Sequence, residues 1–192
     1  MDKTEDLTLE EQIENIYHVD RWSEGYFTIN QKGHLCANPM RAEKGPLIDL
    51  IDVIEEIKEK NIGLPVVVRF NDILRSQVIN LNETFRKTIR EAEYNGRYVG
   101  VYPIKVNQKR EVVEEILDAG KEYAFSLEAG SKPELLSVLA FNEENQSLMI
   151  LNGYKDVEYL KLALLGRKLE RNAIVVIEKF TELVDLVNLA SE

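Results

Sequence analysis

The segment YVGVYPIKVNQ, Tyr98–Gln108, gives the first indication of the fold, because a short apolar run in it ends at a lysine. Its β-branched and aromatic residues are typical of a buried strand, and Pro103 stands where such a strand can stop. We therefore expect Lys105 at the mouth of a β-structure, half removed from water. Desolvation frees the lone pair of an amine, as a Schiff-base lysine requires, although most lysines at strand ends are simply solvated.

The same pattern recurs along the chain, where short apolar runs alternate with helical segments. The other runs are PVVVRF (Pro65–Phe70), YAFSLEA (123–129), SLMILNG (147–153) and AIVVIE (173–178). Runs that are apolar on both faces and alternate with helices predict a parallel sheet. The fold class is therefore α/β, either a doubly wound sheet or a partial (β/α)8 TIM-type barrel of about five βα units.

Four helices are predicted between and after these strands. They are Arg110–Gly120, 131–141, Tyr154–Gly166 and 180–192. Gly120 and Gly166 stand where a glycine commonly caps the end of a helix. Ser131 and Glu134 have the spacing of a capping box, in which each side chain accepts a hydrogen bond from the backbone N–H of the other residue.

The sequence before Leu64 has a different character. YFTINQKGHLCAN (26–38) predicts a β-hairpin that turns at Gln31–Gly33. PLIDLIDVIEEIKEKN (46–61) predicts a helix with an apolar stripe. We interpret residues 1–45 as an N-terminal arm with β structure and residues 46–192 as an incomplete barrel domain.

The amino-acid composition limits which binding partners and which cellular compartment we expect for this protein. The 192 residues include 44% hydrophobic types, which is typical of a globular protein, and a net charge of −10 argues against nucleic acid or an anionic membrane as partner. Cys36 is the only cysteine, which excludes an internal disulfide and suits a reducing compartment. The acidic N-terminus lacks a signal-peptide core, and the apolar runs are too short to span a membrane, so we expect a cytoplasmic protein.

Polar residues follow the predicted strands at their carboxyl ends, which form the active face of a parallel barrel. They are Lys105, Glu128, Asn152 and Glu178, with Arg69 and Asn71 flanking the end of the first strand. A lysine converging with carboxylates would suit Schiff-base chemistry. Spacing alone favours the simpler interpretation that strand ends are polar because they meet solvent. In that case Glu128 stabilises the next helix start, Asn152 belongs to a turn, and Glu178 is a solvated loop residue.

Other chemically notable residues give weaker signals. His18 and His34 lack the partner spacing of a zinc site, and Cys36 is expected to pack as a small hydrophobic residue. Trp22 and Phe27 are expected to be packing anchors of the N-terminal arm, with Tyr26 between them in the same role.

Several motifs together resemble the biosynthetic arginine decarboxylases, pyridoxal-phosphate enzymes with an alanine-racemase-like barrel. They are VYPIKVNQ (101–108), LEAGSK (127–132), RFNDIL (69–74) and the N-terminal RWSEGYFTINQKGHL (21–35). The resemblance runs from about Ile16 to Glu192 and implies a cofactor bound through Lys105 as a Schiff base. It further implies decarboxylation of L-arginine to agmatine and CO2 for polyamine synthesis. Glu128 matches a cofactor-side acidic position that is aspartate in the related ornithine decarboxylases.

The resemblance also implies features outside this chain. Relatives continue past Glu192 with further barrel strands, a phosphate site and a C-terminal β domain, and they use magnesium, for which the sequence offers no ligand cluster. Their sites form between subunits, so a homo-oligomer is expected when the protein is full length. We therefore expect this chain alone to be an inactive N-terminal portion.

Three alternatives remain open on the sequence. A non-catalytic pyridoxal-phosphate-binding barrel is disfavoured by the N-terminal arm. Another barrel-type amino-acid decarboxylase or racemase is disfavoured by the IKVNQ and LEAGSK forms. A purely structural fragment is the third.

Overall fold

The computed structural model describes residues 7–41, 45–141 and 147–191, and within these ranges the strands form two separate sheets. The chain divides into two compact units, residues 1–73 and 74–192. No helix in the described ranges is long and apolar enough to cross a membrane. The elements are α1 (Leu9–Tyr17), α2 (Val19–Ser23), β1 (Phe27–Ile29), β2 (Leu35–Ala37), β3 (Ile48–Asp49), α3 (Leu50–Glu59), α4 (Asn71–Glu91), β4 (Val101–Pro103), α5 (Arg110–Gly120), the 3-10 helix η1 (Lys121–Tyr123), β5 (Ser126–Ala129), α6 (Lys132–Phe141), β6 (Leu148–Leu151), α7 (Val157–Lys168), β7 (Asn172–Val175) and α8 (Phe180–Ala190).

The first unit contains the antiparallel sheet β1-β2-β3. The predicted hairpin is confirmed, with Phe27 opposite Ala37 and the turn between β1 and β2. The predicted helix 46–61 begins later than expected, because Ile48–Asp49 pairs with β2 and Asp49 Oδ1 caps α3 by accepting from Ile51 N at 2.9 Å. The antiparallel sheet thus continues past residue 45, and the domain boundary placed there stays a prediction.

The strand predicted at Pro65–Phe70 was wrong. These residues have neither helix nor strand structure, and Val67 is 76% exposed. A run of β-branched residues favours extended backbone, but a strand also needs a neighbour whose N–H and C=O groups it can pair with. The described part of the chain therefore contributes four parallel strands rather than five.

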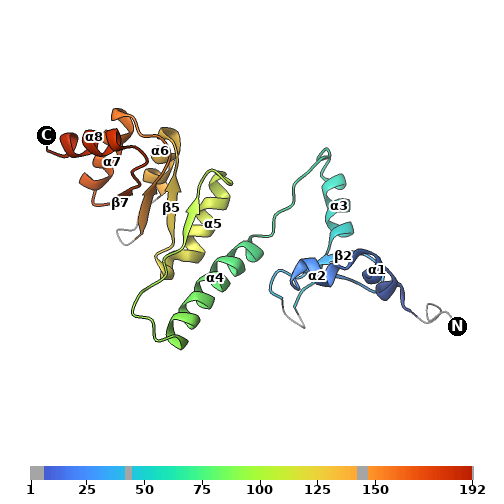
Figure 1. Ribbon diagram of the computed structural model, residues 1–192. Coiled ribbons are helices and arrows are strands. Elements are labelled where there is room, and N and C mark those ends of the chain that lie inside the picture. Colours follow the sequence, from blue (N-terminus) through green and yellow to red (C-terminus); the bar gives the residue numbers. More distant parts are fainter. Residues whose placement is uncertain (1–6, 42–44, 142–146, 192) are drawn as a thin grey trace. The chain divides into compact units, whose positions relative to one another are not determined.

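The second unit is built on a parallel sheet whose strand order is β4-β5-β6-β7 (Figure 1). Each strand pairs with the strand that follows it in the sequence, and Leu127 lies between Tyr102 and Met149 in the register. In a doubly wound sheet the order of the strands reverses at a switch point. The unbroken order here is instead that of a barrel wall. Right-handed crossovers then bring α5, α6 and α7 to one face of the sheet.

The core of this unit lies between the sheet and those helices. Residues from β5, β6 and the turn after β4 pack against residues from α5, α6 and α7, and all are nearly inaccessible to water. They are Ile104, Val113, Leu127, Ala129, Leu135, Val138, Met149, Leu151, Tyr159 and Ala163. Full burial of one such large apolar side chain stabilises the fold by about 1.5–3 kcal/mol, so this layer holds the strands in place.

Helix α4 packs against α5 at the edge of the same unit. Val78 joins an apolar cluster with Val112 and Ile116. The Arg75 guanidinium also donates to Glu115 Oε1 and Asp118 Oδ2, each at 2.6 Å. These carboxylates raise the pKa of Arg75 above its ordinary value.

The capping role predicted for two glycines was wrong. Gly120 is the last residue of α5 and Gly166 lies inside α7, and the left-handed residues that follow them are Ala124 and Glu170. Both glycines serve close packing instead, since a Cβ on Gly120 would lie 2.3 Å from the Cβ of Phe125.

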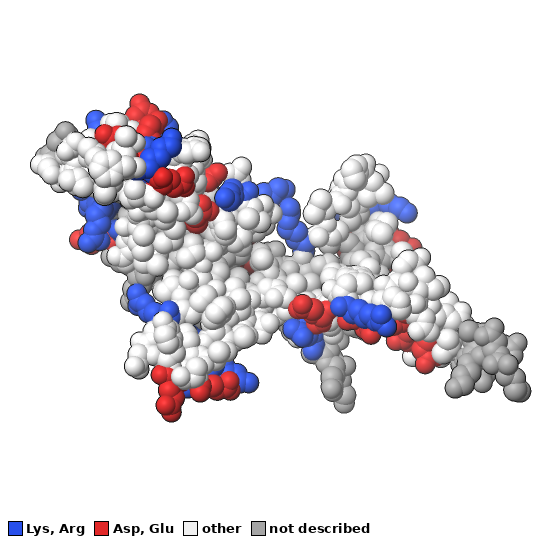
Figure 2. Space-filling view, viewed as in Figure 1, with Lys and Arg blue, Asp and Glu red and all other residues white. Residues whose placement is uncertain are grey.

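The surface of the chain mixes charges of both signs. On the face seen in Figure 2, Lys and Arg lie beside Asp and Glu, with broad uncharged areas between these groups.

Candidate functional site

Four residues expected at the carboxyl edge of the parallel sheet do lie at the ends of successive strands. Lys105 follows β4, Glu128 is within β5, Asn152 follows β6 and Glu178 follows β7. Because these strands are parallel neighbours, their carboxyl ends meet at one edge. Arg69, the polar residue expected at the end of the unformed strand, belongs to the unit of residues 1–73, and so does Asn71.

Lys105 lies in the turn that follows β4, and its backbone is fixed by its neighbours. Ile104 is completely buried, and its N–H donates to the carbonyl oxygen of Glu128 at 3.1 Å. The half-desolvated environment expected for Lys105 was wrong, because the side chain is exposed. The physical reason is that β4 has only β5 as a neighbour among the described strands, so one side of the turn faces solvent.

Glu128 is buried, with 5% of its surface exposed, and its two carboxylate oxygens differ. Oε1 accepts a hydrogen bond from Asn152 Nδ2 at 3.1 Å. Oε2 is buried and has no hydrogen-bond partner among the described residues. A buried unpaired carboxylate oxygen is costly, so it marks a position where a donor from outside these residues would bind favourably.

The capping box expected from Ser131 and Glu134 is replaced by a different contact at the start of α6. Glu134 Oε2 accepts from Gly130 N at 2.7 Å, rather than from the backbone of Ser131. The contact of Glu128 is made to Asn152 of the next loop. The side chain of Glu134 thus holds the start of α6, which is the role that the simpler interpretation gave to Glu128.

Two glycines let the loops after β5 and β6 approach each other closely. Gly153 has a φ of +74°, and a Cβ there would lie 2.3 Å from the carbonyl oxygen of Gly130. A Cβ on Gly130 would lie 3.6 Å from Glu128 Oε1. The chain bends at Gly153, in the segment where a turn was expected, and this bend determines how near Asn152 stands to Glu128.

Two buried residues beside this edge escaped the sequence reasoning. The side chains of Lys155 and Glu182 are 0% and 3% exposed, and Lys155 Nζ lies 3.7 Å from Glu182 Oε2. A lysine on a polar loop and a glutamate in the first turn of a helix are both expected to be exposed to solvent. Only their contact across 27 residues reveals the pair, and no local pattern predicts such a contact.

The histidine, cysteine and aromatic residues singled out in the N-terminal arm contact neighbouring protein groups. His34 Nδ1 lies 2.8 Å from Asp49 Oδ2, and burial raises the pKa of the Cys36 thiol. Of the three expected packing anchors, Tyr26 is buried, with 4% of its surface exposed. The ring of Trp22 lies 5.7 Å from that of Phe27, but Trp22 is 55% exposed and is not a buried anchor. Within the described ranges, no group of three or more His, Cys, Asp or Glu could hold a metal ion.

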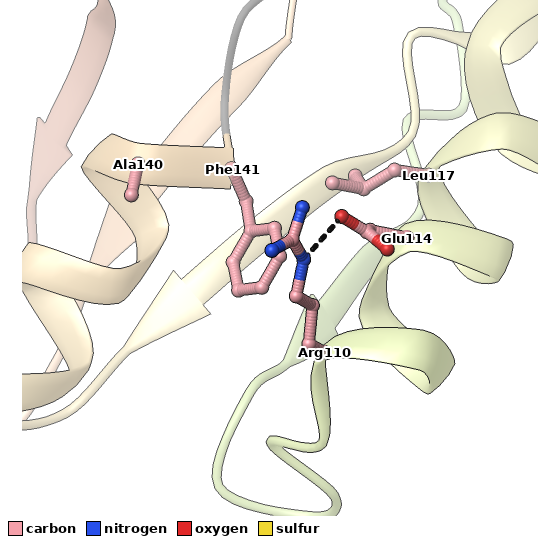
Figure 3. Close-up of a pocket in the computed structure, with 5 residues that line it drawn as sticks. All are labelled: Arg110, Glu114, Leu117, Ala140 and Phe141. Atoms are coloured by element: carbon pink, nitrogen blue, oxygen red, sulfur yellow. Dashed lines mark hydrogen bonds and ion pairs between the residues drawn. The ribbon is translucent and has the colours of Figure 1, made fainter.

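A hollow of about 510 Å³ is lined by residues of α5 and α6 (Figure 3). Arg110 Nε donates to Glu114 Oε1 at 2.7 Å in it, and Leu117, Ala140 and Phe141 complete the lining. The Arg110 side chain is 80% exposed and the hollow includes none of the four edge residues, so it is not the candidate site.

Comparison with known families identifies the domain that contains this edge of the sheet. Residues 76–192 match the family described as "Pyridoxal-dependent decarboxylase, pyridoxal binding domain". The chain belongs to the pyridoxal-dependent decarboxylases. This match includes all four βα units and every edge residue from Lys105 to Glu178.

Individual relatives show which branch of this family the chain resembles. It is 45% identical over 188 residues to a biosynthetic arginine decarboxylase of Gloeobacter violaceus, covering 98% of this chain and 29% of the relative. It is also 45% identical over 177 residues to the enzyme of that name from Parasynechococcus marenigrum, covering 92% and 27%. The resemblance to biosynthetic arginine decarboxylases is thus confirmed.

A solved structure agrees. The crystal structure of the biosynthetic arginine decarboxylase SpeA from Campylobacter jejuni matches with a TM-score of 0.82 and 32% identity. The match covers 91% of this decarboxylase chain and 28% of that protein. The partial barrel predicted from the sequence is confirmed, and the chain spans under a third of the length of the relatives that it matches.

The edge residues fit pyridoxal phosphate, whose pyridoxal group is named in the family description. The exposed Lys105 amine is accessible for a covalent bond to an aldehyde, and the unpaired Glu128 Oε2 is an acceptor for a proton donor. The close approach at Gly130 and Gly153 brings the loops that follow β5 and β6 together beside that acceptor.

Proposed function

We propose that this chain supplies the lysine-bearing part of a pyridoxal-phosphate-dependent arginine decarboxylase, which converts L-arginine to agmatine and CO2 for polyamine synthesis. The observation that carries the proposal is a placement: Lys105, in the turn after β4, and Glu128, on the neighbouring strand β5, lie at the same edge of a pyridoxal-binding domain. The buried Glu128 carboxylate there has an oxygen without a hydrogen-bond partner among the described residues. The family match and the names of the relatives support the reaction and the substrate.

Lys105 has the role of covalent anchor in this proposal. Its amine would hold the cofactor by condensing with the aldehyde group with loss of water, and the buried Ile104 would keep the backbone of the turn fixed. Pyridoxal phosphate, when bound, supplies the electron sink for breaking the bond to the α-carboxylate. The protein contributes placement and charge.

Glu128 orients and stabilises the bound group. Asn152 Nδ2 donates to Oε1, which fixes the carboxylate plane and leaves Oε2 to accept a proton-bearing donor. A preorganised buried acceptor stabilises positive charge more strongly than water does, since its dipole does not have to reorient. Removing this acceptor should therefore weaken cofactor binding.

The proposal has further parts for the protein in which the chain acts. Because the chain spans under a third of its relatives' length, we assign the activity to the full-length enzyme, as a homo-oligomer, and not to this chain alone. A cytoplasmic location is supported by the single free thiol of Cys36. Magnesium stays a proposal for the full-length enzyme without a step assigned to it, because the described residues offer no cluster to hold it.

The test uses the full-length enzyme that contains this sequence, with Lys105→Ala and the matched control Lys109→Ala in the same exposed loop. Agmatine formation and the visible absorbance of lysine-bound cofactor should both vanish in Lys105→Ala and persist in Lys109→Ala. Absorbance that depends on Lys105 without agmatine formation would favour a binding protein or a racemase. Wild-type enzyme that binds no cofactor would refute the proposal.

A further inference from the structure

A buried ion pair lies behind the site and has no role in the function proposed above. The side chains of Lys155 and Glu182 are almost completely removed from water. Burying two charges costs several kcal/mol, and a well-packed apolar pair of similar volume is often equally stable. Stability alone therefore does not explain the pair.

The Glu182 carboxylate ties two loops together. Oε1 accepts from Lys155 N at 3.1 Å, in the loop after β6, and Oε2 accepts from Glu178 N at 3.0 Å, in the loop after β7. Burial alone would raise the pKa of Glu182, but hydrogen bonds from the N–H groups of Glu178 and Lys155 and the nearby ammonium lower it below its ordinary value. The ionised form thus suits this position.

The Lys155 ammonium completes the clamp on the loop after β6. Lys155 Nζ donates to the carbonyl oxygen of Gly153 at 2.6 Å. Gly153 N in turn donates to Glu178 Oε1 at 2.8 Å. Gly153 is thus held from both its N–H and its C=O group, while its Cα rests against Gly130.

The residue fixed by this clamp is Asn152. Its N–H donates to the carbonyl oxygen of Ala129 at 2.8 Å, and its side chain holds Glu128 Oε1. Contacts therefore run without a break from Glu182 through Gly153 and Asn152 to the carboxylate whose other oxygen is unpaired.

We propose that Lys155 and Glu182 are positioning residues, which hold the Asn152–Gly153 turn so that Asn152 fixes Glu128 for the cofactor. This inference rests on the proposed function for its cofactor part. Within the described part of the chain, the pair makes no hydrogen bond or ion pair with Lys105 or Glu128, so it acts only through the turn. Its effect should consequently disappear when Asn152 can no longer contact Glu128.

The experiment is a double-mutant cycle in the full-length enzyme, with pyridoxal phosphate as the titrated ligand. Glu182→Gln and Asn152→Ala should each weaken cofactor binding by about tenfold, the value of one hydrogen bond to a charged group. The double variant should also lose about tenfold rather than a hundredfold, because both changes break one chain of contacts. The double variant Lys155→Met/Glu182→Gln removes both charges of the pair. It therefore serves as a control in which neither charge is left buried without its partner.

Hydrogen exchange of the segment 151–156 gives a readout that needs no cofactor. Exchange should accelerate in Glu182→Gln and stay unchanged in Lys132→Met, which removes an ion pair between Lys132 and Asp156 at the surface. Multiplicative losses in the cycle, unchanged affinity, or unchanged exchange would each overturn the inference. If wild-type enzyme binds no cofactor at Lys105, the proposed function fails and the cofactor part with it, and the exchange rates alone decide whether the clamp exists.

Discussion

The two faces of the parallel sheet differ in what covers them. On the face packed by α5, α6 and α7, Leu127, Met149 and Leu151 are at most 1% exposed. The alternation of side chains along a strand places the next residues on the opposite face, where Ile174 is 45% exposed. The row on that face, read across the register, is Pro103, Glu128, Ile150 and Ile174.

The two faces therefore have different roles: one stabilises the fold, and the other carries the candidate site. The helix-covered face is apolar and closed within the described residues, so it fixes the strands whatever binds at their ends. The opposite face carries a buried carboxylate, Glu128, with an oxygen that has no partner among the residues the structure describes, and a stable fold alone would avoid this cost. Functional sites commonly hold such local costs because the surrounding fold supports them.

The largest expected effect tests the closed face. Leu151→Ala should destabilise the chain by about 2–5 kcal/mol, because it leaves a cavity in a fully buried layer. Ile174→Ala, on the open face, should cost less than about 1 kcal/mol, since much of that side chain already meets water. Urea denaturation of the 192-residue chain followed by circular dichroism measures both. Equal losses would contradict the contrast between the faces.

A smaller effect is expected where the loops meet at the carboxyl edge. Gly153→Ala should cost about 2 kcal/mol or more, because the residue needs a positive φ and its Cβ would collide with the Gly130 carbonyl oxygen. Gly63→Ala is the matched control, since a Cβ there meets nothing within 4 Å. Thermal unfolding of the two variants should separate them clearly, and equal melting temperatures would argue against the tight loop contact.

A gain in stability is expected at the unpaired carboxylate. Glu128→Gln should raise the free energy of unfolding of the cofactor-free protein by about 1 kcal/mol, because a neutral amide is cheaper to bury than a charge. The same change should weaken cofactor binding in the full-length enzyme. Glu158→Gln, at a carboxylate 79% exposed, should change neither quantity. Loss of stability in Glu128→Gln would show that Oε2 is satisfied after all.

The smallest effect is a pH dependence. Glu182 has a lowered pKa in the folded chain, so its stabilising contribution is complete above the ordinary glutamate pKa of about 4.3 and is lost as the pH falls through the lowered value. Acid unfolding of the wild type should therefore be steeper in this range than that of Glu182→Gln. Parallel stability curves for the two proteins would remove Glu182 as an acid-sensitive group.

Local sequence patterns correctly predicted those helices and strands whose formation depends mainly on their own residues. The range Arg110–Gly120 was correct to the residue, because its apolar periodicity matches one buried face. Pro65–Phe70 failed as a strand because pairing depends on a neighbour elsewhere in the chain. Lys105 and Glu128 were placed correctly at one edge, since parallel strands align their ends. The exposure of Lys105 and the Lys155–Glu182 pair depend on contacts between distant residues, which no local pattern contains.

The strand order has a consequence for synthesis on the ribosome. Each strand of the parallel sheet pairs with the strand made just before it, from β4 to β7. Each of the βα units that follow β4 can therefore dock on a surface that has already emerged, and none of β5, β6 and β7 has to wait for a distant partner. Loop-closure entropy is small for such neighbours, so vectorial emergence and native order favour the same pathway.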